Sequence, residues 1–279
     1  MLLFKHKGFL LKFFLILTVP ATSMPLIAQE QMAHKPIRID ANQLEGVLNF
    51  RDIGGYKTAD GHTIRYNVVY RSATLHEMTL SDNQKLAPLK IRYEIDLRTA
   101  TERSTAPTNW GPNSPEVIDI PFLRVGTLPN SPDPAQVQAM IRHFYADNVV
   151  VNAPTIGTIL HDLAQGDEPV LIHCTGGVDR TGMTVAVLMT ILGVSRNDVY
   201  REYLVSGKLT KEQLRRIVAN SGVAISPKTL KAISIQPSSL DAFFASIDKN
   251  YGSFDAYVRN GLKLSNQDIQ SLRRRLLVD

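Results

Sequence analysis

Apolar residues follow two patterns along this chain, and the patterns alternate through its first two thirds. Short runs rich in apolar residues, or alternating with polar ones, predict strands, whereas apolar residues every three or four positions predict helices. The predicted strands lie at 63–72, 91–98, 117–121 and 169–172. The predicted helices lie at 79–89, 134–148, 154–165, 181–192, 196–206, 210–219, 238–249, 253–259 and 265–277.

Strands that alternate with helices, followed by a block of helices, predict an α/β protein in which helices wrap a central sheet. Ligands of such sheets bind beyond the C-terminal ends of the strands. Asp96 lies near the C-terminal end of one predicted strand, and Cys174 follows another. We therefore expect these two residues to lie close together at one edge of the sheet.

One loop, between a predicted strand and a predicted helix, combines several reactive residue types. It reads His173-Cys174-Thr175-Gly176-Gly177-Val178-Asp179-Arg180-Thr181-Gly182. Unpaired backbone N–H groups and the positive end of a helix dipole make such a loop an anion site. A thiol lies at its start, and six positions later comes a guanidinium whose planar fork suits two phosphate oxygens. This combination indicates nucleophilic attack on a phosphoryl group.

The first 28 residues differ from the rest of the chain. Three lysines precede an apolar run at 13–19, and small or turn-forming residues follow at 20–23 and again at Ala28. This order predicts a signal peptide at 1–28, and hence export to the periplasm or secretion, with a single domain at 29–279. The apolar run is short for a membrane span, so we expect no stable membrane insertion after cleavage. An uncleaved anchor or an ordinary N-terminal helix is the alternative.

Charge and cysteine content narrow the possible functions. The chain has a formal net charge of +5, but residues 1–28 contribute three lysines and no acid, which leaves 28 basic against 26 acidic residues. This balance does not indicate a nucleic-acid partner. Cys174 is the only cysteine, so it cannot form a disulfide within the chain. Its place in a glycine-containing loop favours a chemical role over that of a buried structural thiol.

The sequence His173-Cys174-x5-Arg180-Thr181 matches the signature of the cysteine-dependent protein tyrosine phosphatase superfamily. Other segments, in the expected order, resemble its bacterial tyrosine phosphatase family. They are Asn49-Phe50-Arg51-Asp52-Ile53-Gly54-Gly55, Asp96-Leu97-Arg98, Tyr203-Leu204-Val205-Ser206 and Tyr251-Gly252-Ser253-Phe254. The resemblance covers almost all of the chain after the predicted signal peptide.

This resemblance implies an α/β fold in which a central, mostly parallel sheet is flanked by helices, as in protein tyrosine phosphatases, with a helical C-terminal block. It also implies hydrolysis through a phosphocysteine intermediate, without a metal or another cofactor. The expected substrate is a phosphorylated protein or a small phosphoester. Phosphotyrosine is the leading candidate, activity on phosphoserine and phosphothreonine is left open, and so is the oligomeric state.

Two departures from the family pattern bear on the substrate and the acid. Val178 stands where many members carry a lysine, which weakens a phosphoinositide interpretation. The tetrapeptide at 110–113 only superficially resembles a Trp-Pro-Asp general-acid loop, since it ends in Asn113. The alternatives are an inositol phosphate or phosphoinositide phosphatase and, from another class, a phosphate-binding module without turnover.

The loop residues receive specific roles in the predicted mechanism. Cys174 is the nucleophile, and Arg180 binds two equatorial oxygens and stabilises the transition state. The expected phosphate-binding residues, largely through their backbone N–H groups, are Thr175, Gly176, Gly177, Val178, Asp179, Arg180 and Thr181. Gly176 and Gly177 allow the backbone to curl. The Thr181 hydroxyl either donates a hydrogen bond to the sulfur or caps the helix.

The leaving oxygen needs a proton, and the second step needs a base. Asp96 and Asp179 are the candidates, with a slight preference for Asp96 because of its place at a strand end. For Asp52 a structural role in a turn is the better interpretation. His173 is expected to order the loop through hydrogen bonds. Thr99 is predicted to cap a helix or turn, with Glu102 three residues further on.

Overall fold

The structure is a computed structural model that describes residues 38–111, 114–123, 133–211, 215 and 226–279. The chain divides into two units, 1–35 and 36–279, and every described residue belongs to the second. The predicted signal peptide and most of the helix predicted at 210–219 lie outside the described residues. No helix of the described part is both long and apolar enough to cross a membrane.

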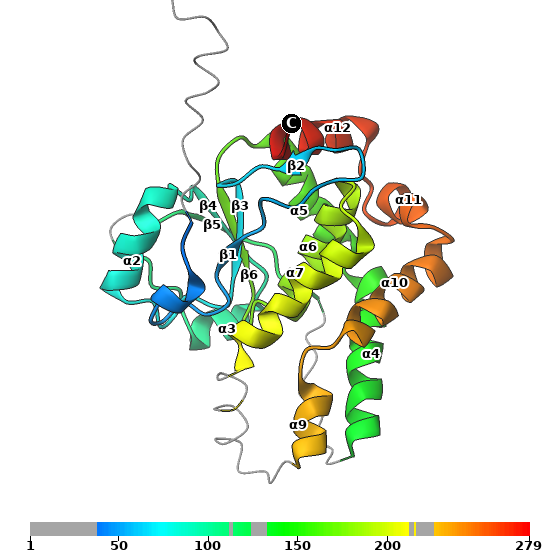
Figure 1. The fold of residues 1–279 in the computed structure, drawn as a ribbon, viewed down its shortest axis with the longest axis horizontal. Coiled ribbons are helices and arrows are strands. Elements are labelled where there is room, and N and C mark those ends of the chain that lie inside the picture. The colour runs from blue at the N-terminus through cyan, green and yellow to red at the C-terminus, as the bar shows by residue number, and fades with distance from the viewer. Residues whose placement is uncertain (1–37, 112–113, 124–132, 212–214, 216–225) are drawn as a thin grey trace, which may run out of the picture. The chain divides into compact units, whose positions relative to one another are not determined.

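A five-stranded sheet forms the centre of the second unit (Figure 1). Its outer strand β1 is antiparallel to β3, and all other neighbouring strands are parallel, so the predicted mostly parallel sheet is confirmed. In spatial order the strands are β1 (Arg51–Asp52), β3 (Val69–Ser72), β6 (Val170–His173), β4 (Tyr93–Asp96) and β5 (Glu116–Asp119).

The single strand predicted at 63–72 is wrong, because the chain turns in its middle. Asn67 adopts a left-handed backbone conformation with φ 64°, which interrupts an extended strand. The first part, β2 (Thr63–Ile64), leaves the central sheet and pairs with the C-terminal strand β7 (Leu277–Val278). Only the second part becomes β3.

Side chains on the central strands alternate between two apolar clusters, one on each face of the sheet. In β6, Val170 and Ile172 join the larger cluster, which includes Met183 and Val187 of helix α6 (Asp179–Ile191). Leu171 between them joins the smaller cluster, which includes Leu86 of helix α2 (Leu80–Leu86). We call these sides of the sheet the α6 face and the α2 face. A parallel strand buried on both faces shows this period of two.

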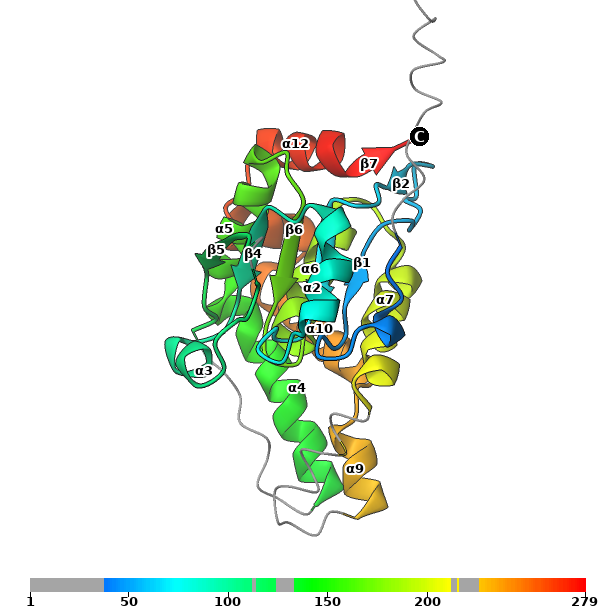
Figure 2. The same cartoon turned by 90° about the vertical axis from the view of Figure 1, so that its left-hand side faces the viewer.

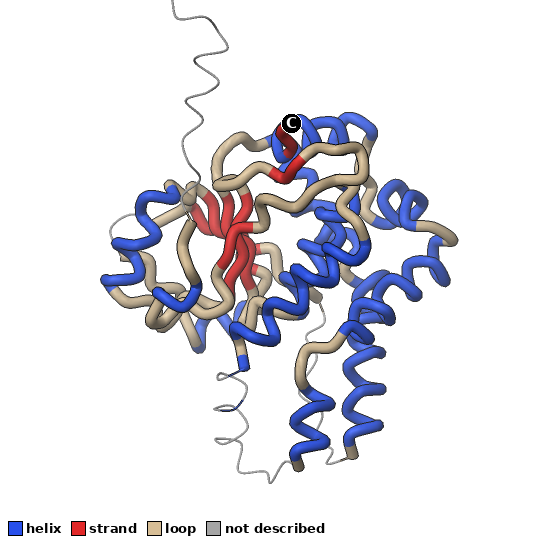
Figure 3. The backbone as a smooth tube through the Cα atoms, in the orientation of Figure 1, coloured by secondary structure: helices blue, strands red, loops and turns tan. Residues whose placement is uncertain are grey.

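Helices cover both faces of the sheet, and most of them lie on the α6 face (Figures 1 and 2). Figure 3 shows how helical the second half of the chain is. The remaining helices are α3 (Ala100–Thr105), α4 (Pro134–Val151), α5 (Ala153–Gln165), α7 (Arg196–Leu209), α9 (Pro227–Ile233), α10 (Pro237–Tyr251), α11 (Phe254–Ala256) and α12 (Asn266–Leu276), with 3-10 turns at Ala41–Gln43 and Ala87–Leu89.

The helix predictions are confirmed in most places. The seven-residue α9 was missed. The helix predicted at 253–259 is one turn of α-helix followed by a π-helical turn, Tyr257–Gly261. The π turn lies against α5, where Gly157 allows a close approach. A Cβ at Gly157 would lie 2.1 Å from the carbonyl oxygen of Leu262.

We predict that Gly157→Ala destabilises the protein by roughly 2 kcal/mol, because the added methyl overlaps a backbone carbonyl that cannot rotate away. Gly207→Ala in α7 is the matched control. It adds a methyl to a helix where the nearest atom, Ile235 Cβ, lies 3.5 Å away, so the better helix propensity of alanine prevails. Urea unfolding measures both free energies, and equal values for the two variants would contradict this packing.

Candidate active site

Cys174 directly follows β6 and is the first residue of the loop at 174–178, which leads into α6. Its side chain is only 2% exposed and belongs to the cluster on the α6 face. It is a free thiol. The buried strand and the buried helix on either side fix both ends of the loop, so the thiol lies at the N-terminal end of α6, where a negative charge is stabilised.

The carbonyl oxygens of this loop are bound by residues from outside it. The Thr175 carbonyl accepts from the backbone N–H of Thr74 at 3.0 Å. The Asn49 amide donates to the carbonyls of Gly176 and Gly177, at 3.1 Å and 2.9 Å. In the described part of the chain, the backbone N–H groups of 175–178 have no protein acceptor. The loop therefore keeps its donors for an anion.

The two loop glycines differ in what they contribute. Gly177 has φ +63°, and a Cβ there would lie 2.1 Å from the Ser72 carbonyl oxygen, so only glycine fits. Gly176 has an ordinary backbone conformation, and the atom nearest to an added Cβ is Val178 Cγ2 at 3.7 Å. The curvature of the loop therefore requires glycine at position 177 but not at position 176.

Arg180 points back across the loop and forms a bidentate ion pair with Glu102 of α3. Its Nη1 donates to Oε2 at 2.8 Å, and its Nη2 donates to Oε1 at 2.7 Å. Further bonds run from Nη1 to the Leu97 carbonyl and from Nη2 to the Thr175 hydroxyl, at 3.2 Å and 3.1 Å. Burial opposes the charge of Arg180, but the negative charges of Cys174 and Glu102 raise its pKa above the ordinary value. The guanidinium is thus charged and held at the loop.

Glu102 is held by α3 itself, through the capping box that the sequence predicts. The Thr99 side chain accepts from the backbone N–H of Glu102, and the Glu102 carboxylate accepts from the backbone N–H of Thr99 at 2.9 Å. Burial opposes ionisation, but hydrogen bonds from Arg180, Thr175 and Thr99 prevail and lower the pKa of Glu102 to about 2. A single carboxylate therefore begins the helix and orients the phosphate-binding arginine.

Asp96 lies next to the loop, as predicted, but on the wrong face for a general acid. It pairs with His173 across β4 and β6, so both side chains lie on the α2 face, whereas Cys174 lies on the α6 face. Both Asp96 oxygens accept hydrogen bonds from Arg98, at 2.8–3.1 Å. Burial raises the pKa of Asp96, but these bonds outweigh it and lower the pKa. These contacts argue against the preference for Asp96 as the acid.

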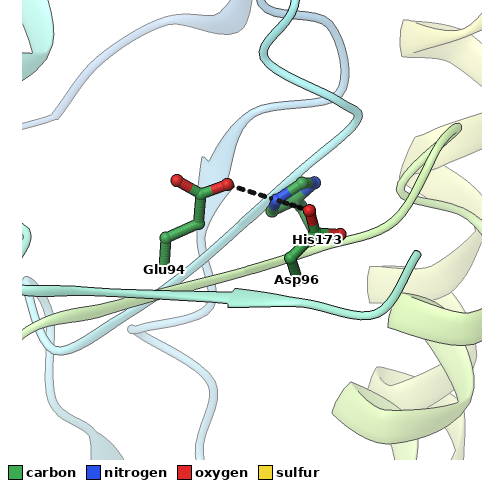
Figure 4. A group of neighbouring side chains, drawn as sticks. All are labelled: Glu94, Asp96 and His173. Atoms are coloured by element: carbon green, nitrogen blue, oxygen red, sulfur yellow. Dashed lines mark hydrogen bonds and ion pairs between the residues drawn. The ribbon is translucent and has the colours of Figure 1, made fainter. Parts of the chain in front are cut away.

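His173 orders the loop through hydrogen bonds, as expected. Its Nε2 lies 2.7 Å from Glu94 Oε1 and 3.7 Å from Asp96 Oδ2 (Figure 4). These three buried residues could offer a ligand set to a metal ion. However, the Glu94 oxygens also accept from Thr108 and Trp110, and Arg98 engages both Asp96 oxygens. The group is therefore better described as a hydrogen-bond network that anchors the start of the loop.

Asp179 is the acidic residue that opens α6 within the loop itself. The residue as a whole is exposed, but its carboxyl group lies against the protein, where Oδ1 accepts from the hydroxyl of the buried Tyr145 of α4 at 2.6 Å. Tyr145 in turn lies 2.7 Å from the Tyr203 hydroxyl of α7. The surrounding protein raises the pKa of Asp179 by desolvation, which the Tyr145 bond and Arg180 only partly offset. A carboxyl group that is accessible and protonates easily is suited to proton transfer.

Of the other residues given a role from the sequence, one has the contacts expected of it and one does not. Asp52 accepts from the backbone N–H groups of Gly54 and Asn67, which confirms its structural role in a turn. Thr181 is buried, and in the described structure its hydroxyl has no partner, so neither the bond to sulfur nor the helix cap is formed. Val178 precedes α6 and packs partly against the larger apolar cluster.

Sequence reasoning missed several residues that shape the site. Asn49 and Arg51 were noticed only as part of the family resemblance, while Arg71, Glu202 and Tyr145 were not identified at all. Their contacts with the loop or with one another join residues far apart in the chain, such as Arg71 and Gly177. Asn49 carried one signal of its own, since asparagine tolerates the left-handed backbone, φ 58°, that it adopts here.

Comparison with known proteins assigns the chain to a family. The profile of the tyrosine phosphatase family matches residues 42–278, so the chain belongs to that family. A Cupriavidus necator protein whose name places it among tyrosine-protein phosphatases is 29% identical, over 81% of this chain and 85% of its own. A tyrosine-protein phosphatase of Nostoc commune is 26% identical, over 74% and 73%. The triple specificity protein phosphatase PtpB of Mycobacterium tuberculosis is 25% identical, over 84% and 98%.

Two solved structures of TpbA from Pseudomonas aeruginosa were also matched. One is 18% identical with a TM-score of 0.30, over 61% of this chain and 89% of its own. The other, a cysteine-to-serine variant in complex with phosphotyrosine, is 16% identical with a TM-score of 0.28, over 76% and 88%. Both TM-scores are too low to inform the fold or the function of this chain.

We predict that Glu102→Gln lowers the free energy of unfolding near neutral pH by about 1 kcal/mol, a value reduced for solvent screening because 26% of the side chain is exposed. The folded pKa of Glu102 lies below its ordinary value, so its stabilisation is present above about pH 4.5 and is lost as the pH falls towards 2.

Urea unfolding at a series of pH values measures this effect. The difference between wild type and Glu102→Gln should narrow as the medium becomes more acidic. Glu116→Gln is the control, because Glu116 is exposed and lies 3.8 Å from the exposed Arg92. A difference that stays constant down to about pH 3 would contradict the ion pair with Arg180.

Proposed function

We propose that this protein hydrolyses phosphotyrosine in proteins through a phosphocysteine intermediate. The observation that carries the proposal is the loop at 174–180. It places a buried thiol, unpaired backbone donors and a charged arginine at the start of α6. The family assignment and the names of three relatives support it.

In the first step the Cys174 thiolate forms a bond to phosphorus, and the bond from phosphorus to the tyrosine oxygen breaks. The loop N–H groups and the Arg180 guanidinium bind the equatorial oxygens, on which negative charge is spread in the transition state. Arg180 can keep its bonds to Glu102 through both Nη atoms while two donors serve the phosphate: the Nε–H, and the Nη2–H that here meets the Thr175 hydroxyl. Glu102 therefore orients the guanidinium without removing all of its donors.

Asp179 is the proton donor that we favour. In its protonated form it gives its proton to the leaving phenolate oxygen as the first bond breaks. In the second step the ionised Asp179 accepts a proton from water, whose oxygen attacks phosphorus and releases Cys174 as a thiolate together with inorganic phosphate. The Tyr145 hydroxyl, which donates to Oδ1, holds the carboxyl group in one orientation throughout.

We also propose that residues 1–28 direct the protein out of the cytoplasm, to the periplasm or beyond. The basic start, the short apolar run and the small residues that follow support this proposal. Fractionation of cells that express the full chain tests it. Mature protein lacking about 28 residues in the exported fraction is expected, and full-length protein confined to the cytoplasm would contradict it.

A panel of substrates at equal concentrations tests the activity. We expect a phosphotyrosine peptide to be hydrolysed with a kcat/KM about tenfold or more above those of a phosphoserine peptide, a phosphoinositide and inositol hexakisphosphate. Val178 brings no charge to a second phosphate, which favours a substrate with a single one. A preference for inositol hexakisphosphate would contradict the proposal. Lack of turnover of any phosphoester under reducing conditions would favour a binding module.

We predict that Asp179→Asn lowers kcat by about 10² with phenyl phosphate, whose leaving group needs a proton, but much less with 2,4-dinitrophenyl phosphate. The raised pKa of Asp179 keeps its acid form present to higher pH. The wild-type kcat with phenyl phosphate should therefore fall as the pH rises through that pKa, and this decline should vanish in the variant.

Asp96→Asn is the comparison, because it removes a buried partner of Arg98 rather than a proton donor. Any loss of kcat relative to the wild type should be the same with phenyl phosphate and with 2,4-dinitrophenyl phosphate, although the variant should be less stable. If instead Asp96→Asn shows the leaving-group dependence and Asp179→Asn does not, Asp96 is the acid.

A further inference from the structure

A group of three charged side chains, two of them buried and one partly exposed, lies beneath the loop, on the side of its carbonyl oxygens. Glu202 of α7 accepts from Arg71 of β3 at 2.6 Å and from Arg51 of β1 at 2.7 Å, one guanidinium on each carboxylate oxygen. Arg71 is fully buried, and Glu202 is nearly so. Burial raises the pKa of Glu202, but the two arginines prevail and lower it, so the carboxylate is ionised.

This charged group contacts the loop by two routes. Arg71 Nη2 donates directly to the Gly177 carbonyl at 2.6 Å. Arg51 Nη1 donates to the side-chain oxygen of Asn49, whose amide nitrogen donates to the carbonyls of Gly176 and Gly177. Arg71 of β3 and Asn49, which precedes β1, therefore hold two successive carbonyls away from the anion side, and Arg51 of β1 holds the Asn49 side chain in place.

The group also carries surplus charge. Two guanidinium groups share one carboxylate, which leaves one surplus positive charge next to the loop. The ionisable residues that face it are Asp179 at the start of α6, Tyr203 of α7 and Tyr56. Asp179 offsets this charge when it is ionised. When Asp179 is protonated, as the first catalytic step requires, the surplus charge beneath the loop is no longer offset.

Fold stability alone explains neither the contacts of this charged group with the loop nor its surplus positive charge. A buried ion pair is weak evidence for a stabilising role, since desolvation of the charges largely cancels their attraction. A third, mostly covered charge adds to that desolvation, and Arg71 also has an Nε without a hydrogen-bond partner in the described structure. Such an arrangement is costly to the fold and is expected where it serves a site.

We propose that Arg71, held by Glu202, is a positioning residue of the phosphatase, which turns the loop donors towards the phosphate and favours the Cys174 thiolate through its charge. The role rests on the proposed function. Asn49 shares the first task but not the second, because it is uncharged. Substitutions of Arg71 and Asn49 can therefore separate the orientation of the loop donors from the effect of the Arg71 charge on Cys174.

Two measurements that need no turnover test this role. One is the affinity for inorganic phosphate, measured by calorimetry. The other is the pH midpoint for alkylation by iodoacetamide, which reports the thiolate of Cys174 without ambiguity because the chain has one cysteine. We expect Arg71→Met to weaken phosphate binding by about tenfold or more and to move the alkylation midpoint upwards by about one pH unit.

Two further variants separate geometry from charge. Arg71→Lys keeps the charge but not the planar fork, so it should restore the midpoint while phosphate binding stays weakened. Asn49→Gly keeps the left-handed backbone and removes the amide, so it should weaken phosphate binding without moving the midpoint. If Arg71→Met fails to fold, these two variants decide the question.

Arg273→Met is the matched control. Arg273 also donates to a backbone carbonyl, that of Leu192, and to a carboxylate, that of Asp60, but its contacts are remote from the loop. Both readouts should stay at their wild-type values. Unchanged phosphate affinity and midpoint in folded Arg71→Met or, where that variant does not fold, unchanged affinity in Asn49→Gly would overturn the inference.

These experiments can contradict the proposed function and the role of Arg71 independently of each other. If the wild type hydrolyses no phosphotyrosine peptide while the substitutions shift binding and alkylation as expected, the positioning of an anion site by Arg71 stands and the phosphatase assignment falls. If the wild type is active but Arg71→Met behaves as Arg273→Met does, the assignment stands and the role of Arg71 falls.

Discussion

The arrangement of the site depends on the fixed orientation of three peptide groups. The carbonyls of Thr175, Gly176 and Gly177 each accept a hydrogen bond from outside the loop, and their N–H groups are left for an anion. Backbone polar groups that are buried must be paired, so a loop whose carbonyls are engaged cannot easily reverse. The left-handed conformation of Gly177 and the buried charges beneath it serve the same constraint.

A second constraint comes from the alternation of side chains on parallel strands. Asp96 lies opposite His173 in the register of β4 and β6, which places it on the α2 face beside Glu94. Cys174, one residue later, lies on the α6 face with Leu97. Two residues that follow neighbouring strands can thus be close in space and still face apart. Asp179 avoids this separation because it belongs to the loop itself.

These two constraints explain which features of the fold and of the site could be predicted from the sequence. Local patterns predicted the parallel strands, most helices, the Thr99 capping box and the loop of Cys174 and Arg180, because each depends on neighbouring residues. The break at Asn67, the register of β4 against β6 and the contacts of Glu202 were not predictable. They depend on how distant segments pair, as in the bond between Arg71 and Glu202, 131 residues apart. The role of Glu102 in orienting Arg180 was missed for the same reason.

The central claim is that Cys174 becomes covalently phosphorylated during turnover. Rapid acid quenching of the full enzyme with excess phosphotyrosine peptide, followed by mass spectrometry of its proteolytic fragments, measures this most directly. We expect one phosphate on the fragment that contains Cys174, formed within the first turnover and absent from Cys174→Ser. Turnover by the wild type with no phosphate on that fragment at any quench time, or undiminished turnover by Cys174→Ser, would contradict it.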